Sequence, residues 1–348
     1  MEKVKVLIWG YGAMGSGMAT MLLKKEGVEI VGVCDTHPDR VGKNFKEVIG
    51  EMSNPHADVI ITDDIDKLIA ETKADVALLA TDSFTKKAFD KIIKCLENKI
   101  NVVSTAEEMA YPQAQAPELA AKIDEVAKAN GVSVLGTGIN PGLIMDLLVL
   151  CLSGCMEEVD HVTARRVNSL SPFGPAVMEE QAVGMDPDTF DELNAKGELA
   201  GHVGFAESVQ MIADGLGVKL DKFEQQMSGI KTEVDRKSKY GFAKAGNLAG
   251  VSMTAQGYVD GKVMIDMQHP QQIEPHLAGQ DTGDYVVLEG NPRVNMAITP
   301  EVDGGIGTIA MCVNMIPHTI NSTPGLHTML DLPVPRAIMG DMRDLIKK

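Results

Sequence analysis

The apolar run Val4-Lys5-Val6-Leu7-Ile8-Trp9 is followed directly by Gly10-Tyr11-Gly12-Ala13-Met14-Gly15. The run has the length and composition of a short buried strand, and the six residues after it fit G-x-G-x-x-G. In this pattern the first glycine permits a tight turn, the second lets a pyrophosphate approach the backbone, and the third lets helix and strand pack closely. A helix predicted over 13–26 would offer free N–H groups to the phosphates. The stretch therefore predicts a strand, turn and helix that bind a dinucleotide.

An acidic residue supports this prediction. Asp35 lies at the end of the second predicted strand, 28–34, at the distance from the glycines that the dinucleotide pattern requires. An acid there accepts hydrogen bonds from both ribose hydroxyls and disfavours a 2′-phosphate. His37 and Arg40 follow closely and can tolerate a phosphate. We therefore expect NAD as the preferred cofactor, with NADP also accepted.

Three polar residues, Thr81, Asp82 and Ser83, follow another apolar run, 75–80. The carboxyl ends of parallel strands line the ligand crevice of an α/β sheet, so these residues can contact a ribose of the cofactor. They can equally be a plain cap for the helix predicted over 85–98. The sequence leaves both interpretations open.

The order of elements predicts two domains. Strands and helices alternate through residue 140, which indicates a Rossmann-type, doubly wound parallel sheet. Residues 141–320 instead show paired strands around Asp260-Gly261 and around 290–292, which predicts a second, α+β domain with a mainly antiparallel sheet. A helix is expected over 304–315. The segment 321–348 is expected to return to the first domain.

Composition excludes several classes of protein. The chain has 348 residues, and its 49 acidic against 32 basic side chains give a net charge of −17, which disfavours nucleic acid and anionic membranes as partners. We find no apolar run long enough to cross a membrane and no secretory leader. Five cysteines predict a reducing cytoplasm rather than disulfides. Cys151 and Cys155 lack partners for a zinc site and are interpreted as core thiols, so no metal is expected.

The acids Glu107 and Glu108 follow the predicted strand 102–104. They come just past its carboxyl end, where the nicotinamide is expected, and one of them is a candidate general base. The other is expected to be solvated, because adjacent acids cannot both point inward. Two surface acids that open a loop are the simpler alternative.

Asn140 belongs to a glycine-rich loop, Gly136–Gly142, after the next predicted strand. Its amide can bond a carboxamide or a substrate amine. An ordinary Asn-Pro turn explains the same residues.

Alternation in the second domain brings a candidate anion site together. Arg166 and Asn168 share one face of the strand predicted over 162–168, at the end of an apolar stripe. A guanidinium binds a carboxylate with two directional hydrogen bonds. His269 ends a similar stripe formed by Val263, Ile265 and Met267, although pattern alone favours an ordinary core histidine there.

Five segments together resemble one family. They are Ile8–Gly15, Cys34–Pro38, Ala106–Pro112, Gly136–Gly142 and Pro335–Asp341. The chain resembles the 2,4-diaminopentanoate dehydrogenases, NAD(P)-dependent amine dehydrogenases whose N-terminal domain is similar to that of dihydrodipicolinate reductase. These segments span nearly the whole chain, so the resemblance is far more specific than a glycine loop alone.

The resemblance implies a reaction and roles for the candidate residues. The C4 amine of 2,4-diaminopentanoate would be oxidatively deaminated to 2-amino-4-oxopentanoate and ammonia, as in the fermentation of ornithine. A glutamate that contacts the amine and activates water would map to Glu107 or Glu108, with Glu107 preferred. Arg166, Asn168 and His269 would bind the substrate carboxylate. Family members are homodimers, so a homodimer is expected.

Two alternatives stay open. A related amine dehydrogenase or reductase that acts on another amine or carbonyl compound would keep the cofactor loop and Glu107 but alter the carboxylate site. A non-catalytic NAD-binding sensor would bind the cofactor without turnover. The anion site argues against a sensor, which has no need of one.

Overall fold

The computed structural model describes residues 2–199 and 201–347 and divides the chain into two compact units. The first contains the residues up to Leu143 and those from Asp303 onward, and the second runs from Ile144 to Val302. The chain therefore returns to the first unit at Asp303, earlier than the boundary at residue 320 set from the sequence. The reason is helix α10 (Gly304–Asn321), whose apolar side chains belong to the core of the first unit.

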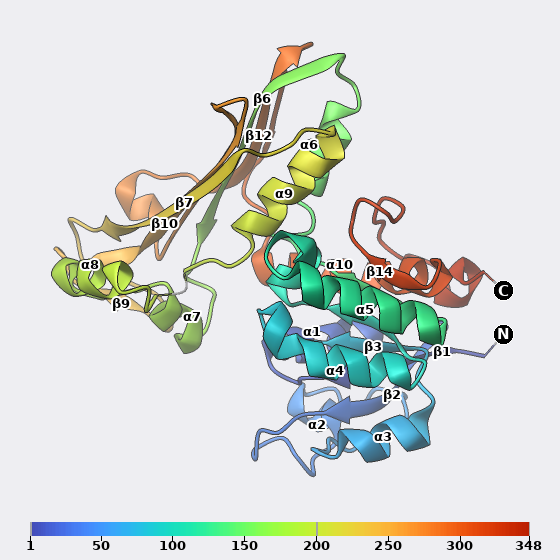
Figure 1. Cartoon of the computed structure of the whole chain (residues 1–348). Helices are drawn as coiled ribbons and strands as arrows, with labels where there is room; N and C mark the ends of the chain where they lie inside the picture. The colour runs from blue at the N-terminus through green and yellow to red at the C-terminus, as the bar shows by residue number, and fades with distance from the viewer. Residues whose placement is uncertain (1, 200, 348) are drawn as a thin grey trace. The chain divides into compact units, whose positions relative to one another are not determined.

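The first unit is built on a six-stranded parallel sheet with strand order β14-β5-β4-β3-β1-β2 (Figure 1). Its strands are β1 (Val4–Trp9), β2 (Val28–Cys34), β3 (Val76–Leu79), β4 (Asn101–Ser104), β5 (Ser133–Gly136) and β14 (Gly325–His327). The predicted Rossmann-type sheet is confirmed. Because the strands are all parallel, their carboxyl ends lie together at one edge of the sheet.

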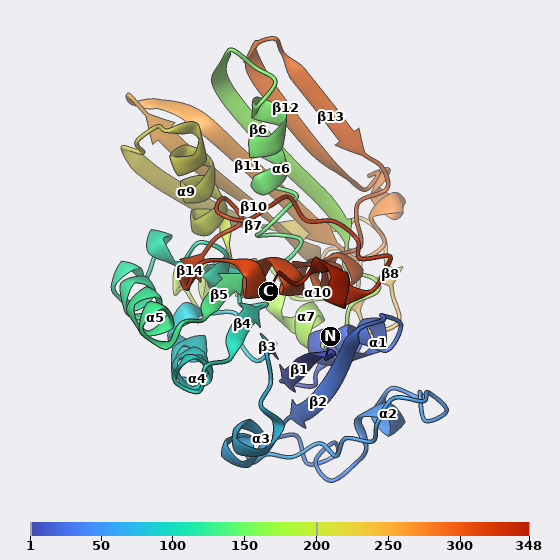
Figure 2. The ribbon, with the colours of Figure 1, turned by 90° about the vertical axis from the view of Figure 1, so that its right-hand side faces the viewer.

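Helices cover both faces of this sheet, which is why strand β1 is apolar throughout. Val6 and Ile8 point into a core shared with α1 (Ala13–Leu22) and α10, whereas Leu7 and Trp9 point into a core shared with three other helices. Figures 1 and 2 show α10 and the α4–α5 pair on opposite sides of the strands. The remaining helices of the unit are α2 (Phe45–Val48), α3 (Ile65–Thr72), α4 (Thr85–Glu97), α5 (Pro117–Asn130), and the 3₁₀ turns η1 (Glu107–Ala110), η2 (Pro112–Ala114) and η4 (Met342–Leu345).

The second unit has a six-stranded sheet with order β13-β12-β6-β11-β10-β7. Strands β6 and β11 run parallel, and the other neighbours are antiparallel, so the mainly antiparallel sheet is confirmed with one parallel pair. The strands are β6 (Glu158–Ser169), β7 (Lys222–Lys231), β10 (Leu248–Val259), β11 (Lys262–Gln272), β12 (Gly283–Asn291) and β13 (Val294–Ile298), with β8 (Arg236–Lys237) and β9 (Phe242–Ala243) as a separate pair.

The predicted hairpin at Asp260-Gly261 is confirmed. Both residues have positive φ, 50° and 73°, as a two-residue turn of type I′ requires. One detail of the pattern is wrong. The register shifts between Gly257, paired with Ile265, and Tyr258, paired with Val263. This bulge moves Val263 to the opposite face from Ile265.

Helices α6 (Leu147–Ser153) and α9 (Phe205–Leu216) lie side by side on the second sheet (Figure 1). The other helical segments of the unit are α7 (Pro175–Glu180), α8 (Pro187–Ala195) and η3 (Pro275–Ala278). The core-thiol interpretation of Cys151 and Cys155 is wrong, because α6 buries Leu147 and Val149 and leaves both thiols exposed.

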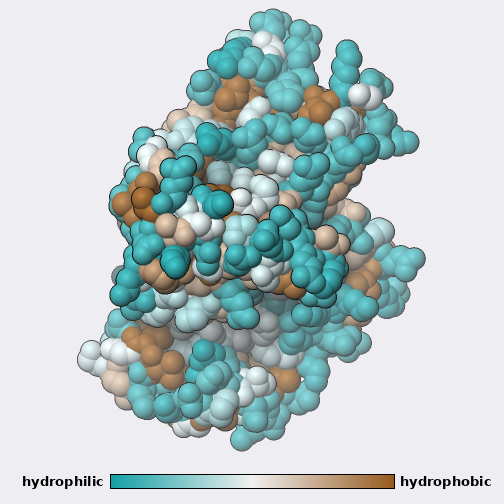
Figure 3. All heavy atoms as spheres, turned by 90° about the vertical axis from the view of Figure 1, so that its left-hand side faces the viewer, coloured by the Kyte–Doolittle hydropathy of each residue, from teal (hydrophilic) through white to brown (hydrophobic). Residues whose placement is uncertain are grey.

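Figure 3 shows a face covered mainly by hydrophilic residues, with apolar side chains in small separate groups. This agrees with the strong excess of acidic residues. Across the described ranges, no helix combines the length and apolar character needed to cross a membrane. Nor do residues 2–199 and 201–347 hold a cluster of three or more His, Cys, Asp or Glu side chains suited to a metal ion.

Candidate active site

The glycine loop between β1 and α1 has the geometry that a dinucleotide needs. Gly10 has a φ of +92°, and a Cβ there would overlap the carbonyl of Ala80, while a Cβ at Gly15 would overlap the carbonyl of Gly10. These two positions therefore require glycine. Gly12 instead faces open space, with nothing within 4 Å of an added Cβ. It begins α1 without a side-chain cap, so the N–H groups of the first turn are left for a phosphate.

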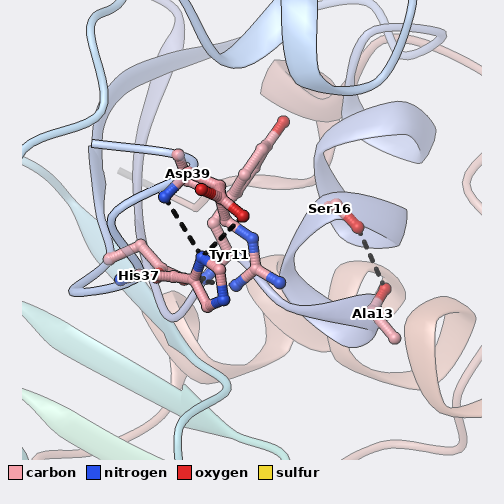
Figure 4. Close-up of polar contacts among 7 residues, drawn as sticks. Tyr11, Ala13, Ser16, His37 and Asp39 are labelled. Carbon is pink, nitrogen blue, oxygen red and sulfur yellow. Dashed lines mark hydrogen bonds and ion pairs between the residues drawn. The ribbon is translucent and has the colours of Figure 1, made fainter. Parts of the chain in front are cut away.

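Asp35 anchors this loop to the end of β2. Its carboxylate accepts hydrogen bonds from the backbone N–H groups of Tyr11 (2.6 Å) and His37 (2.7 Å) and from Nη1 of Arg40 (3.1 Å). Burial would raise the pKa of Asp35, but these three donors outweigh it and lower the pKa. Figure 4 shows Tyr11 and His37 close together. Asp35 thus stays ionised and holds the loop, and its contact with a ribose stays a prediction.

Other members of the loop have structural contacts of their own. The side chain of Tyr11 is buried and donates its hydroxyl to the carbonyl of Phe45 (3.0 Å), while its backbone N–H is bound by Asp35, so Tyr11 supports the shape of the loop. Ala13 opens α1 and accepts a hydrogen bond from the hydroxyl of Ser16 (Figure 4). Met14 is half-buried beside Gly305 of α10.

The residues after β3 form a charged network. Asp82 accepts hydrogen bonds from Oγ1 of Thr81 (2.5 Å) and from Nζ of Lys91 in α4 (2.6 Å). Burial would raise the pKa of Asp82, but these two partners lower it. The N-cap position of α4 is Phe84, so Thr81, Asp82 and Ser83 do not occupy it. Their contact with a ribose stays a prediction.

The two glutamates lie on η1, directly after β4, and both are half-buried. Glu108 has identified partners, because its backbone N–H donates to the carbonyl of Ser83 (3.2 Å) and its Oε2 accepts from the backbone N–H of Thr85 (2.7 Å). The carboxylate of Glu108 thus sits at the start of α4. Which of the two glutamates is the base stays a prediction, with Glu107 preferred on the family resemblance.

Asn140 follows β5 at the same edge of the sheet as the glycine loop and η1. It is half-buried and precedes Pro141 in a cis peptide. The loop is fixed from α10, where Oγ1 of Thr308 accepts a hydrogen bond from the N–H of Ile139 (3.2 Å). The parallel sheet thus brings all the sequence-predicted residues of the first unit to one edge.

In the second unit, the three predicted carboxylate contacts lie together on one face of the sheet. Arg166, Asn168 and His269 are only 2%, 6% and 2% exposed. Strands β6 and β11 are neighbours, and Nδ1 of His269 is 2.8 Å from the carbonyl oxygen of Arg166. The amide oxygen Oδ1 of Asn168 is buried and has no hydrogen-bond partner among the described residues. A buried polar atom of this kind is expected to have a partner, which a bound ligand can supply.

Arg166 has a partner that the sequence did not reveal. Its Nη1 lies 2.5 Å from Oδ1 of Asp284, directly opposite on β12, and its Nη2 donates to the carbonyl of Val302 (2.6 Å). Burial raises the pKa of Asp284, while Arg166 and the N–H of Val302 act to lower it. These contacts use two N–H groups of the guanidinium and leave others for a ligand.

His202 is a site residue that the sequence analysis missed. Its ring lies edge-on to His269 with centroids 4.8 Å apart, and Phe205 packs on both rings. Burial, followed by the charge of Arg166, lowers the pKa of His202 to about 4, and burial also holds that of His269 well below its ordinary value. Both rings are thus neutral at physiological pH. His202 lies in a loop without periodicity, so no sequence signal could have found it.

Comparison with known proteins decides the family. Residues 143–348 match the model of the 2,4-diaminopentanoate dehydrogenase C-terminal domain, and residues 4–131 match that of the dihydrodipicolinate reductase N-terminus. A 2,4-diaminopentanoate dehydrogenase of Acetoanaerobium sticklandii is 62% identical over 349 residues, covering 100% of this chain and 98% of that protein. The chain belongs to the 2,4-diaminopentanoate dehydrogenase family.

Further relatives of this 2,4-diaminopentanoate dehydrogenase family member are amine dehydrogenases. One from Streptomyces virginiae is 26% identical over 355 residues, covering 96% of this chain and 98% of that protein. The structure of another, from Mycobacterium smegmatis, has a TM-score of 0.86 at 25% identity and covers 97% of this chain and 98% of that one. The chain is therefore an amine-directed oxidoreductase that uses a nicotinamide cofactor, and the glycine loop described above fits that cofactor.

Proposed function

We propose that this chain oxidatively deaminates 2,4-diaminopentanoate at C4, giving 2-amino-4-oxopentanoate and ammonia. The observation that carries the proposal is the 62% identity, over the full chain, to a 2,4-diaminopentanoate dehydrogenase. The side chains of both units fit this chemistry, because one unit carries a dinucleotide loop and a glutamate, and the other carries a buried anion site.

The anion site is proposed to bind the C1 carboxylate of the substrate. Arg166 keeps its positive charge at any physiological pH, and the N–H groups that Asp284 and Val302 do not use can donate to the carboxylate. His269 is neutral and donates its single N–H, on Nδ1, to the carbonyl of Arg166, so its Nε2 can only accept, for example from the amine at C2 of the substrate. His202 beside it is also neutral and adds no charge. The NH2 group of Asn168 can donate to the carboxylate, and its buried Oδ1 can accept from the same amine. Fixing the distant carboxylate in this way orients C4 for reaction, which is a positioning effect.

At the reacting carbon, C4 loses a hydride and becomes an iminium carbon. The bound oxidised nicotinamide supplies the chemistry of this step by accepting the hydride. Water then adds to the iminium carbon, and its proton passes to the carboxylate of Glu107. Glu107 then returns this proton to the amino group, and ammonia leaves as the hydroxyl group gives up its proton to Glu107 and the carbonyl forms. An ionised carboxylate at this position also stabilises the cationic iminium electrostatically.

We infer that NAD is preferred and that NADP is accepted. Asp35 favours the two free hydroxyls of NAD. Arg40 already balances the charge of Asp35 from 3.1 Å and is partly exposed, so its guanidinium can turn to a 2′-phosphate. Repulsion between Asp35 and that phosphate is thereby weakened.

A homodimer and a cytoplasmic location complete the proposal. The homodimer follows from the family resemblance and is tested by light scattering of the purified protein. The five cysteines without disulfides fit a reducing compartment.

The test is the formation of reduced nicotinamide, followed by absorbance, with purified protein, NAD or NADP and 2,4-diaminopentanoate at alkaline pH. Parallel reactions contain ornithine, lysine, homoserine and simple amines. Turnover with the diamino acid alone supports the proposal. Turnover only with another amine would change the proposed substrate but keep the proposed amine dehydrogenase activity. Such an amine dehydrogenase is the second candidate function, because relatives with 25–26% identity are amine dehydrogenases. Cofactor binding without any turnover would favour a sensor.

A further inference from the structure

Glu108 joins the two turns that follow β3 and β4 through both its backbone and its side chain. Glu108, on η1, donates its backbone N–H to the carbonyl of Ser83 (3.2 Å) and accepts the backbone N–H of Thr85 through Oε2 (2.7 Å). Both partners are distant in the sequence, and Thr85 lies 23 residues earlier in the chain than Glu108. Because β3 and β4 are adjacent parallel strands, the contacts tie one strand end to the next.

The contact with Thr85 is a helix cap supplied from another part of the chain. Thr85 is the first residue of α4, and Phe84 at the N-cap position provides no side-chain hydrogen bond. The first N–H groups of a helix have no partner within the helix, and a carboxylate there also interacts favourably with the helix dipole.

The capped segment is connected to the predicted cofactor residues. Asp82 is held by Lys91, one helical turn and a half into α4, and by its neighbour Thr81. The start of α4, the loop that precedes it and η1 therefore form one hydrogen-bonded unit. The other side of η1 is also fixed, because the backbone of Met109 packs closely on Gly136. A Cβ atom at position 136 would overlap the carbonyl group of Met109.

We propose that Glu108 is a positioning residue, which holds the turn that carries Glu107 against the loop after β3. Glu107 then performs the chemistry, and Glu108 sets its place relative to the cofactor loop. This inference rests on the proposed function for the role of Glu107. The contacts of Glu108 itself are independent of that role.

The test compares Glu108→Gln, Glu108→Ala and Glu107→Gln in the full-length protein. An amide oxygen can still accept the N–H of Thr85, so Glu108→Gln should keep kcat within roughly threefold. Glu108→Ala should lower kcat roughly 10- to 100-fold through misplacement of Glu107, with the pH profile of kcat unchanged in shape. Glu107→Gln should lower kcat by roughly 100-fold or more and remove the limb of that profile due to the base.

A matched control is Asp64→Ala, since Asp64 caps α3 by accepting the N–H of Lys67 (2.9 Å). It should lower the melting temperature without changing kcat. Hydrogen exchange at the Thr85 amide, which does not depend on activity, should be slow in the wild type and Glu108→Gln and fast in Glu108→Ala.

Two results would overturn the inference. If Glu108→Gln loses as much activity as Glu108→Ala, then Glu108 itself takes part in the chemistry. Glu108→Ala with a normal kcat and a lower melting temperature would reduce its role to helix stability, as in Asp64→Ala. Wild-type turnover is measured first, and its absence with every amine would refute the proposed function together with this inference.

Discussion

The buried pair of Arg166 and Asp284 should dominate the stability of the second unit. The side chains are 2% and 0% exposed, and Nη1 and Oδ1 are 2.5 Å apart, so water screens neither charge. Replacing Asp284 by Asn keeps the shape but leaves the guanidinium buried without its counter-charge. Removal of one partner from a buried pair costs about 3–5 kcal/mol. With roughly 2–4 °C for each kcal/mol, the melting temperature should fall by roughly 6–20 °C.

The assay is thermal unfolding followed by circular dichroism at neutral pH, with Glu289→Gln as the matched control. Glu289 lies on the same strand, β12, and pairs with Arg293 at 2.8 Å, but both side chains are about half exposed. Water and salt screen that pair, so its loss should leave the melting temperature unchanged. The double variant Arg166→Met with Asp284→Leu should recover most of the lost stability while losing substrate affinity. A fall of less than about 2 °C in Asp284→Asn would refute the reasoning.

Acidification tests the neighbouring histidines, His202 and His269. Because the pKa of His202 is lowered from 6.5 to about 4, the unfolded chain binds a proton in that window and the folded chain does not. Stability should therefore be full above pH 6.5 and fall as the pH decreases toward 4, and a melting temperature that rises on acidification would contradict this. Gly15→Ala should weaken NADH binding by about tenfold or more in calorimetric titration, a loss of about 1.4 kcal/mol; unchanged affinity would remove the loop from the cofactor site. Arg40→Ala should raise KM for NADP about tenfold more than KM for NAD, whereas equal changes would limit Arg40 to supporting Asp35.

Local sequence patterns predicted a large part of this fold, because the backbone conformation at these positions depends mainly on neighbouring residues. The G-x-G-x-x-G loop was predictable, since only glycine fits the backbone at positions 10 and 15. Asp260-Gly261 was predictable because few residue pairs adopt two consecutive positive φ angles. The shared face of Arg166 and Asn168 followed from the two-residue period of a strand.

Contacts between segments that are distant in the sequence could not be predicted from such local patterns. The pairing of Arg166 with Asp284 depends on the register of two strands that are 118 residues apart in the sequence. The bulge that turns Val263 away from Ile265 breaks the period with no signal in the residues themselves. The contact of Glu108 with the first residue of α4 depends on where α4 begins relative to η1, which is a tertiary contact.

The order of the segments along the chain has a consequence for synthesis. The second unit is inserted into the first, whose edge strand β14 and helix α10 are made only after Val302. Until then, α1 alone covers one face of the first sheet in a nascent chain, and Ile8 and Met18 lack the partners that Cys312 and Ile316 provide. We expect this face to be a binding site for chaperones on the ribosome, and the nucleotide loop to become competent only when translation is nearly complete.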